Sequence, residues 1–488
     1  MSLRRIDARF LLPRRPSDAV VFGALDGWRR GLEEAGIPET PDGAAADLAV
    51  ASSGELEDAV RSRASMVIVE GRRAARALRR AGYAVTRWAP LGDPARPDLL
   101  LPLDQPSAAR YAIERWIVPE TRVKQLRNRA VVALATRGAW PPPAPIVTIA
   151  TKPEGRASLL TAAGSAGVEA GELFVSLGGA DDLARGVAHL FKEGEPAPDW
   201  VLKFARAPGY TRPFDLDERG LALAAEIGGR VAEHAPRLVG RFQVQGMEAS
   251  IETAARGMRM VNFLKAPGAR APKLAAVERV AEWIVDIGSE TRGTPETLDA
   301  ERKRLRDEVL PAWTHMGVRS SLVDELPPLP SVMRRGDLGA WNLVVDDDDF
   351  TAVDWETAHR GGFPVWDLLY FLTDALAHLE GASRDDGRDE FARALFRGEQ
   401  RSSPVLFRWV RRGVEALSLP ADAVGPIATL CWLSVGLAHV RRGETARAIR
   451  PGAEVQIPPA ERIAPLWMAD PLLGPSWDRW KTGRSGAA

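Results

Sequence analysis

Three polar residues spaced around a predicted β-hairpin place the strongest constraint on how this chain folds. Asp337 and Asn342 stand five residues apart, and Asp354 follows twelve residues after Asn342. The runs Leu343–Val345 and Thr351–Val353, which lie between them, are short and rich in β-branched residues. Two such runs around a polar turn predict a hairpin, and a hairpin brings Asn342 and Asp354 to the same end.

The chemistry of these three residues predicts a site for phosphoryl transfer. Amide and carboxylate oxygens suit Mg²⁺, a hard ion that keeps water and phosphate oxygens as its other ligands. Phosphoryl transfer also needs a carboxylate that takes or orients the proton of the acceptor hydroxyl. We therefore expect Asn342 and Asp354 to bind the metal and Asp337 to be catalytic. Each residue taken alone is equally compatible with a turn or strand end.

The acidic run Asp346–Asp349 lacks the spacing and glycine of a calcium loop, so we expect a solvated turn.

The segment around these residues resembles the phosphotransferase family that includes aminoglycoside phosphotransferases and choline kinases. That family has His-Gly-Asp, an asparagine five residues after the aspartate, a strand ending in Asp-Trp-Glu, and then Gly-x-Pro-x-x-Asp-Leu. The matching residues here are Arg335-Gly-Asp337, Asn342, Val353-Asp354-Trp355-Glu356 and Gly362-Phe-Pro364-Val-Trp-Asp367-Leu368. The resemblance implies an α+β, bilobal protein-kinase-like fold over about residues 150–480. It implies a small lobe at 146–250 and a largely helical large lobe at 251–488, with a catalytic loop at 335–342.

The resemblance also implies roles for individual residues. Asp337 matches the catalytic base, while Asn342 and Asp354 match the Mg²⁺ ligands. Asp367 matches a structural carboxylate that ties the catalytic loop to the next helix, and Glu356 closes the Asp-Trp-Glu motif beside the site.

Arg335 is a departure from the family pattern, which has a histidine at this position. The histidine is mainly a scaffold that bonds to nearby backbone. An arginine can also bond carbonyls, but it adds a permanent charge beside the phosphate site. Arg335 therefore belongs to the candidate catalytic residues, either holding phosphate or marking weakened catalysis.

A kinase-like fold also needs a strand lysine that pairs with nucleotide phosphates and a helix glutamate that holds the lysine. Lys203 lies in an apolar run that predicts a strand, although a lone lysine there is ordinarily an edge or snorkelling residue. Glu218, near the start of a predicted helix, is the expected partner, with Glu226 in reserve. Gly178 and Gly179 follow another predicted strand and would let backbone amides approach phosphates, but an ordinary hairpin turn explains them equally.

Residues 1 to about 145 predict a separate α/β domain with a Rossmann-like parallel sheet. Short apolar runs alternate there with helical patterns. Gly23 follows the first run, but the sequence is not Gly-x-Gly-x-x-Gly, so a tight turn explains it, with a degenerate nucleotide or methyl-donor pocket as the alternative. The proline-rich Trp140–Pro145 marks the expected boundary. The runs are Ala19–Phe22, Leu48–Ala51, Met66–Val69 and Ala84–Thr86.

Composition indicates a cytoplasmic protein. Cys431 is the single cysteine, so no intramolecular disulfide forms and no thiolate zinc site is possible. The 65 basic and 65 acidic residues give a formal net charge of zero, so the overall charge does not indicate nucleic-acid binding. We expect no membrane span, because no uncharged apolar run approaches about 20 residues.

These observations together predict an ATP- and Mg²⁺-dependent phosphotransferase that acts on a hydroxyl of a small polar molecule, of the sugar, aminoglycoside or amino alcohol class. One alternative is a regulatory nucleotide-binding protein on a kinase-like fold, motivated by Arg335. Another makes the N-terminal domain a transferase.

Overall fold

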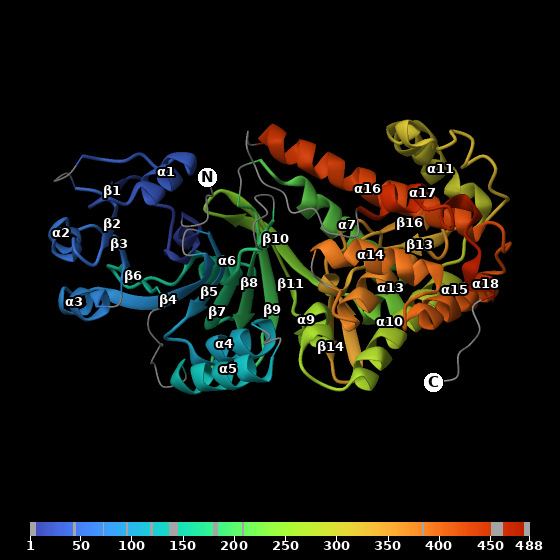
Figure 1. Cartoon of the computed structure of the whole chain (residues 1–488). Coiled ribbons are helices and arrows are strands. Elements are labelled where there is room, and N and C mark those ends of the chain that lie inside the picture. The colour runs from blue at the N-terminus through green and yellow to red at the C-terminus, as the bar shows by residue number, and fades with distance from the viewer. Residues whose placement is uncertain are drawn as a thin grey trace. The chain divides into compact units, whose positions relative to one another are not determined.

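The computed structural model describes residues 6–41, 45–71, 73–93, 96–117, 121–135, 145–178, 184–206, 209–382, 385–449 and 462–482. The chain divides into two compact units. The first comprises Met1–Phe214 and Arg237–Ala255, and the second comprises Asp215–Pro236 and Arg256–Ala488. Each unit has its own sheet and helices (Figure 1).

The first unit is built on an eleven-stranded sheet, in the order β1-β2-β3-β6-β4-β5-β7-β8-β9-β11-β10. Strands β1, β2 and β3 pair in parallel. Every other neighbouring pair in this sheet is antiparallel. The strands are β1 (Ala19–Val21), β2 (Leu48–Ser52), β3 (Met66–Glu70), β4 (Ala84–Asp93), β5 (Arg96–Pro102), β6 (Val147–Thr151), β7 (Glu172–Ser176), β8 (Gly186–Phe191), β9 (Trp200–Phe204), β10 (Leu238–Val244) and β11 (Met247–Thr253).

The helices of the first unit are short, apart from α5. They are η1 (Ile6–Leu11), α1 (Asp26–Glu34), α2 (Leu56–Arg61), α3 (Ala74–Arg80), α4 (Pro106–Tyr111), η2 (Ala112–Trp116), α5 (Arg122–Ala135) and α6 (Ser158–Ser165). Helix α7 (Arg212–Ile227) begins in the first unit and continues in the second.

The four apolar runs near the N-terminus are strands, as predicted, and β1 to β3 pair in parallel. Strand β4 runs in the same direction as β3, but the predicted parallel pairing is wrong for it, because β6 lies between the two strands and is antiparallel to both. On its other side, β4 forms a hairpin with β5. A hairpin is the physical outcome because the connection between β4 and β5 is far too short for a parallel crossover. The boundary expected at Trp140–Pro145 falls mostly outside the described residues. Strand β6, just beyond it, pairs between β3 and β4, so the sheet continues across that position.

The second unit is mainly helical, with two small sheets of order β12-β14-β15 and β13-β16. Its strands are β12 (Met258–Arg259), β13 (Val332–Arg334), β14 (Leu343–Asp346), β15 (Asp349–Ala352) and β16 (His359–Gly362). Its helices are α8 (Gly229–Glu233), α9 (Met260–Lys265), α10 (Arg270–Glu290), η3 (Pro295–Leu298), α11 (Asp299–Arg304), η4 (Leu305–Val309), α12 (Leu310–Ala312), η5 (Thr314–Met316), η6 (Ala340–Asn342), α13 (Trp366–Leu379), α14 (Asp385–Arg397), α15 (Ser403–Leu417), α16 (Val424–Ile449), α17 (Ile463–Ala469), η8 (Gly474–Ser476) and α18 (Arg479–Thr482).

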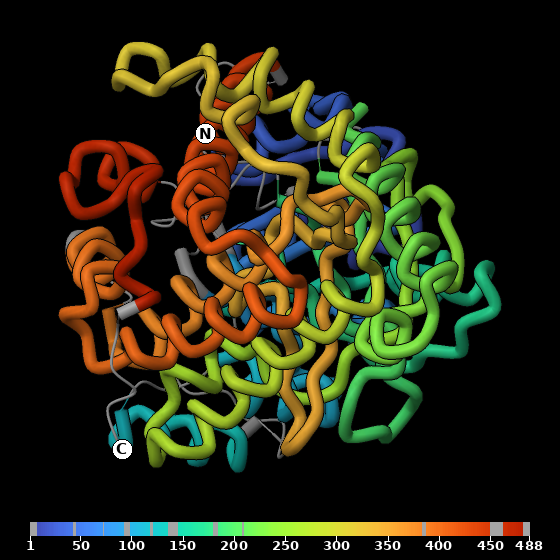
Figure 2. The backbone as a smooth tube through the Cα atoms, turned by 90° about the vertical axis from the view of Figure 1, so that its right-hand side faces the viewer, coloured from blue at the N-terminus to red at the C-terminus, as the bar shows by residue number. Residues whose placement is uncertain are grey.

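The C-terminal helices, orange to red in Figure 2, gather together within the second unit. Apolar residues recur at helical spacing in four segments after residue 365, and these segments are helices α13 to α16; the segments are Leu368–Leu379, Phe391–Leu395, Leu406–Leu417 and Ile427–Val440. Helix α13 is buried along almost its whole length, because α9, α10, α14, α15 and α16 all contact it. The tryptophans Trp467, Trp477 and Trp480 near the C-terminus are also buried.

Helix α16 contains the one segment among the described residues, Val424–Ala448, that is long and apolar enough to cross a membrane by length and composition. Two thirds of its most apolar window is buried inside the structure, as in the core helix of a globular protein.

Candidate active site

The candidate catalytic loop, residues 335–342, connects two small sheets of the second unit. It starts after β13, ends in the 3₁₀ turn η6, and leads into the predicted hairpin, which is confirmed as β14 and β15. Leu343 pairs with Ala352 at the open end of the hairpin, and the Val353 amide donates to the Asn342 carbonyl at 2.9 Å. Asn342 and Asp354 therefore lie at the same end. Asp354 has φ of +65°, a left-handed backbone that is uncommon outside glycine.

Two side chains donate to the carboxylate of Asp337. The Tyr370 hydroxyl lies 2.9 Å from Oδ1, and the Asn342 amide nitrogen lies 3.3 Å from Oδ2 and 2.8 Å from the Asp337 carbonyl. Because the NH₂ group of Asn342 is turned toward Asp337, its amide oxygen is the atom left to act as a ligand.

The electrostatic surroundings favour the protonated form of Asp337. Burial raises the pKa of Asp337, and the nearby charge of Asp354 raises it further, while the Tyr370 hydrogen bond and the charges of Arg335 and Arg442 oppose that rise. A carboxylate whose pKa is shifted toward neutrality is suited to accept a proton from an alcohol.

Arg335 is fully buried and bonds to backbone. Its Nη2 donates to the carbonyls of Val353 and Asp354, both at 2.7 Å. Its guanidinium also stacks over the Trp355 ring at 4.1 Å. Burial lowers the pKa of Arg335, while nearby carboxylates, led by Asp354, oppose that effect. The arginine thus fixes the backbone of the strand end that carries Asp354.

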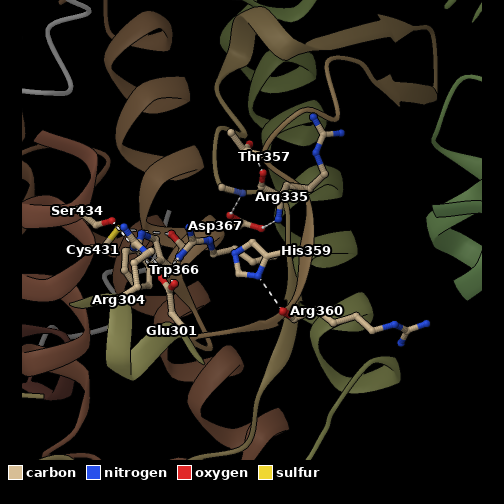
Figure 3. Close-up of polar contacts among 12 residues, drawn as sticks. Glu301, Arg304, Arg335, Thr357, His359, Arg360, Trp366, Asp367, Cys431 and Ser434 are labelled. Atoms are coloured by element: carbon tan, nitrogen blue, oxygen red, sulfur yellow. Dashed lines mark hydrogen bonds and ion pairs between the residues drawn. The ribbon is translucent and has the colours of Figure 1, made fainter. Parts of the chain in front are cut away.

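One face of helix α13 holds the catalytic loop at three points. The carboxylate of Asp367 accepts from the amides of Arg335 at 2.6 Å and Gly336 at 2.9 Å, and Thr357 donates to the Arg335 carbonyl (Figure 3). Tyr370 contacts Asp337 in the middle of the loop. The carboxylate of Asp374 accepts from the Ala340 amide at 2.7 Å. Asp367, Tyr370 and Asp374 follow the i, i+3, i+7 spacing that places residues on one helical face.

Sequence reasoning did not identify Asp374. It lies at 0% side-chain exposure and pairs with Arg388 of α14, whose guanidinium lies 6.0 Å from the centre of the Trp341 ring. The sequence does contain a sign of its role. Asp374 is a carboxylate within a mostly apolar helix, and a buried charge needs hydrogen-bonding or ionic partners.

A second carboxylate that sequence reasoning missed is Asp217 on α7. It is 3% exposed, and its Oδ1 accepts from the Trp355 amide at 2.8 Å. Its neighbour Glu218, the predicted lysine partner, is exposed, and Glu226 pairs with Arg360 at 3.0 Å on the surface. Glu356, which follows Trp355, is half-buried.

Arg259 is a third residue that the sequence did not single out. It ends β12, which pairs with β14 of the hairpin. Burial lowers the pKa of Arg259 to about 10, and the nearby charge of Asp354 opposes this. A cation therefore lies near the end of the hairpin that carries Asn342 and Asp354.

A buried ionic cluster supports β13, the strand that leads into the catalytic loop (Figure 3). Glu301 of α11 accepts from Arg304 Nε at 2.7 Å and from Arg334 Nη1 at 2.9 Å. Burial alone would raise the pKa of Glu301, but the Arg304 hydrogen bonds and the Arg334 charge outweigh it and lower the pKa to about 2. Arg304 also donates to Ser434 of α16 at 2.7 Å, so this cluster connects three elements.

In the first unit, Lys203 lies on β9, as the predicted strand requires, and it is 6% exposed. Its Nζ lies 3.0 Å from Oε2 of Glu252, on the neighbouring strand β11. This buried ion pair with Glu252 was not predicted. Gly178 follows β7 and has φ of +62°, where a Cβ atom would meet Ala184 at 2.9 Å. Gly179 lies outside the described residues.

The donor set of the second unit fits a hard divalent cation. Among the residues that the structure describes, no group of three or more His, Cys, Asp or Glu side chains could hold a metal ion alone. A site with one carboxylate, from Asp354, and one amide oxygen, from Asn342, leaves the remaining positions to water and phosphate oxygens, as Mg²⁺ sites commonly do.

No protein-family model and no curated protein matches the chain. Solved structures similar to it include a choline/ethanolamine kinase family protein from Mesorhizobium loti, 21% identical with a TM-score of 0.32, where the match covers 64% of this chain and 94% of that one. A glucosamine kinase in complex with glucosamine, ADP and inorganic phosphate is 15% identical with a TM-score of 0.33, covering 56% and 76%. An aminoglycoside phosphotransferase from Streptomyces rimosus is 14% identical with a TM-score of 0.31, covering 54% and 97%. The function proposed below rests on the geometry around Asp337.

Proposed function

We propose that this chain is an ATP- and Mg²⁺-dependent phosphotransferase that phosphorylates a hydroxyl group of a small polar molecule. The observation that carries the proposal is the convergence of Asp337, Asn342 and Asp354 at one end of the β14–β15 hairpin. Asn342 contacts Asp337 directly, and the pKa of Asp337 responds to the charge of Asp354.

Each residue has a distinct proposed task. Asp337 accepts or orients the proton of the acceptor hydroxyl, which is a positioning role with modest proton chemistry. Asn342 and Asp354 would hold Mg²⁺, and the bound ion would supply charge neutralisation for the transferring phosphoryl group. Arg335, Asp367 and Tyr370 keep these groups in place through contacts with backbone and carboxylate.

Lys203 is the proposed residue for the nucleotide phosphates, because it is a buried strand lysine with a carboxylate partner. Kinases take that carboxylate from a helix, whereas in this chain it is Glu252, on the neighbouring strand β11. Glu218, the partner predicted from sequence, is exposed on α7.

The test is nucleotide turnover by the full-length protein. Formation of ADP from Mg²⁺-ATP is measured with a panel of sugars, aminoglycosides and amino alcohols. We expect Asp337→Asn to lower kcat on an accepted substrate by about 10²- to 10⁴-fold, while Mg²⁺-ATP binding, measured by calorimetry, is retained.

Asp346→Asn is the matched control, since it makes the same substitution at an exposed position of the same hairpin. It should leave kcat unchanged. A wild-type protein that neither binds nor turns over Mg²⁺-ATP, or an Asp337→Asn variant as active as wild type, would contradict the proposal.

A further inference from the structure

Helix α5 has an unusual composition for a surface helix. Its 14 residues, Arg122–Ala135, include four basic side chains and no acidic one. It packs on α4 and η2 of the first unit (Figure 1).

The inner face of α5 is held by a small set of contacts. The side-chain amide of Asn128 donates to the Ile117 carbonyl at 2.8 Å, and Val131 and Val132 pack against the core cluster beneath α4. The Thr121 hydroxyl accepts from the Lys124 amide at 3.3 Å, as an N-cap does. The helix therefore already has a buried side, and its other side is available.

That other side is apolar. Val123 is 77% exposed, Leu126 66% and Leu134 40%. Six large hydrophobic side chains are exposed among the residues that the structure describes, and these three share one helix. Isolated exposed hydrophobic residues are ordinary, whereas a cluster of them marks an interaction surface.

Basic residues border this apolar stripe on both sides. With 3.6 residues per turn, Val123, Leu126 and Leu134 fall within about a quarter of the helix circumference. Arg122 and Arg129 flank the stripe on one side and Arg127 flanks it on the other, while Lys124 lies further round the helix, between the positions of Val131 and Asn128. All four basic residues are exposed.

A narrow aliphatic stripe bordered by basic side chains matches the interface of a lipid bilayer. The aliphatic side chains can enter the boundary between headgroups and acyl chains, while the long basic side chains reach back to phosphate groups. The net charge of α5 requires that the lipid surface be anionic.

We propose that α5 is a docking helix that binds the surface of an anionic phospholipid bilayer, lying in its plane. Helix α5 belongs to the first unit and the catalytic loop to the second, and the proposal does not depend on the proposed phosphotransferase activity.

The test is co-sedimentation of the full-length protein with vesicles. We expect binding to vesicles of phosphatidylcholine mixed with phosphatidylserine, and little binding to phosphatidylcholine alone. Arg127→Glu with Arg129→Glu should weaken binding by at least about twentyfold, since each cation near an anionic surface contributes about fivefold. Val123→Ser with Leu126→Ser should also weaken it, although the basic residues remain.

Helix α3 supplies the matched control. Arg79→Glu with Arg80→Glu makes the same charge change on another exposed basic helix of the first unit, where the apolar residues Ala75 and Leu78 are buried. This variant should bind mixed vesicles like wild type, and all variants should melt at the wild-type temperature because the altered residues are exposed. Equal loss in the α3 variant, no binding to mixed vesicles, or a preference for heparin over vesicles would each overturn the proposal.

Discussion

Removing the Tyr370 hydroxyl should move the acidic limb of the pH–rate profile to higher pH. Tyr370→Phe keeps the buried ring and deletes only the group that donates to Asp337 Oδ1 at 2.9 Å. A hydrogen bond to a charged group contributes about 1.5–3 kcal/mol, and one pKa unit corresponds to about 1.4 kcal/mol. Loss of the bond should therefore raise the pKa of Asp337 and, at a pH on the acidic limb, lower kcat/KM by about tenfold or more.

The sign follows from which form of Asp337 is active. The ionised carboxylate accepts the proton, so activity falls as the pH drops below the pKa of Asp337. Burial already raises that pKa, and the Tyr370 hydrogen bond opposes the rise. In Tyr370→Phe the opposition is gone, and kcat/KM should decline at a higher pH while its plateau changes less.

The assay is kcat/KM against pH for whichever acceptor the substrate panel identifies. Thr373→Val is the matched control, because it removes a buried hydroxyl from the same helix that donates to the Leu369 carbonyl instead. An unshifted acidic limb in Tyr370→Phe, or an equal shift in Thr373→Val, would refute the reasoning.

Three further predictions concern the support of the catalytic loop. Arg335→Ala should lower the free energy of unfolding by about 3 kcal/mol, since it removes a buried side chain and leaves two half-buried carbonyls, of Val353 and Asp354, without this donor. Urea denaturation measures this, and a loss below about 1 kcal/mol would mean that the guanidinium contacts contribute little. Asp367→Ala should lower kcat and stability together, because the amides of Arg335 and Gly336 lose their acceptor; unaltered kcat would show that the loop keeps its shape without it. Glu301, with its pKa lowered to about 2, should contribute about 3 kcal/mol of stability above pH 4.5 that is lost as pH falls toward 2; acid unfolding of Glu301→Gln should therefore show a shallower pH dependence, and identical curves would count against it.

Local sequence patterns were sufficient for the elements around the site. Two short runs rich in β-branched residues around a polar turn predicted the β14–β15 hairpin, and apolar residues at helical spacing predicted helices α13 to α16. The spacing of Asp337, Asn342 and Asp354 then placed the three together, because a hairpin fixes which of its neighbours meet.

Contacts between distant elements could not be predicted in the same way. Lys203 and Glu252 are 49 residues apart, and their pairing depends on the register between β9 and β11. Asp217 rather than Glu218 faces inward because of the orientation of α7 about its own axis. The apolar periodicity of a sequence defines that orientation only to within about one residue. The place of β4 in the sheet depends on β6, a later strand that lies between β3 and β4, and neither β5 nor β6 was recognised as a strand from the sequence.

The three contacts from α13 to the catalytic loop have a consequence for motion. The amides of Arg335, Gly336 and Ala340 all donate to carboxylates on a helix that is buried on nearly every side. Such a helix cannot swing away locally, so these amide protons can exchange with solvent only when the second unit opens as a whole. We therefore expect the catalytic loop to open no more often than the second unit unfolds. Under the proposed function, any movement that admits a substrate must therefore arise in other segments.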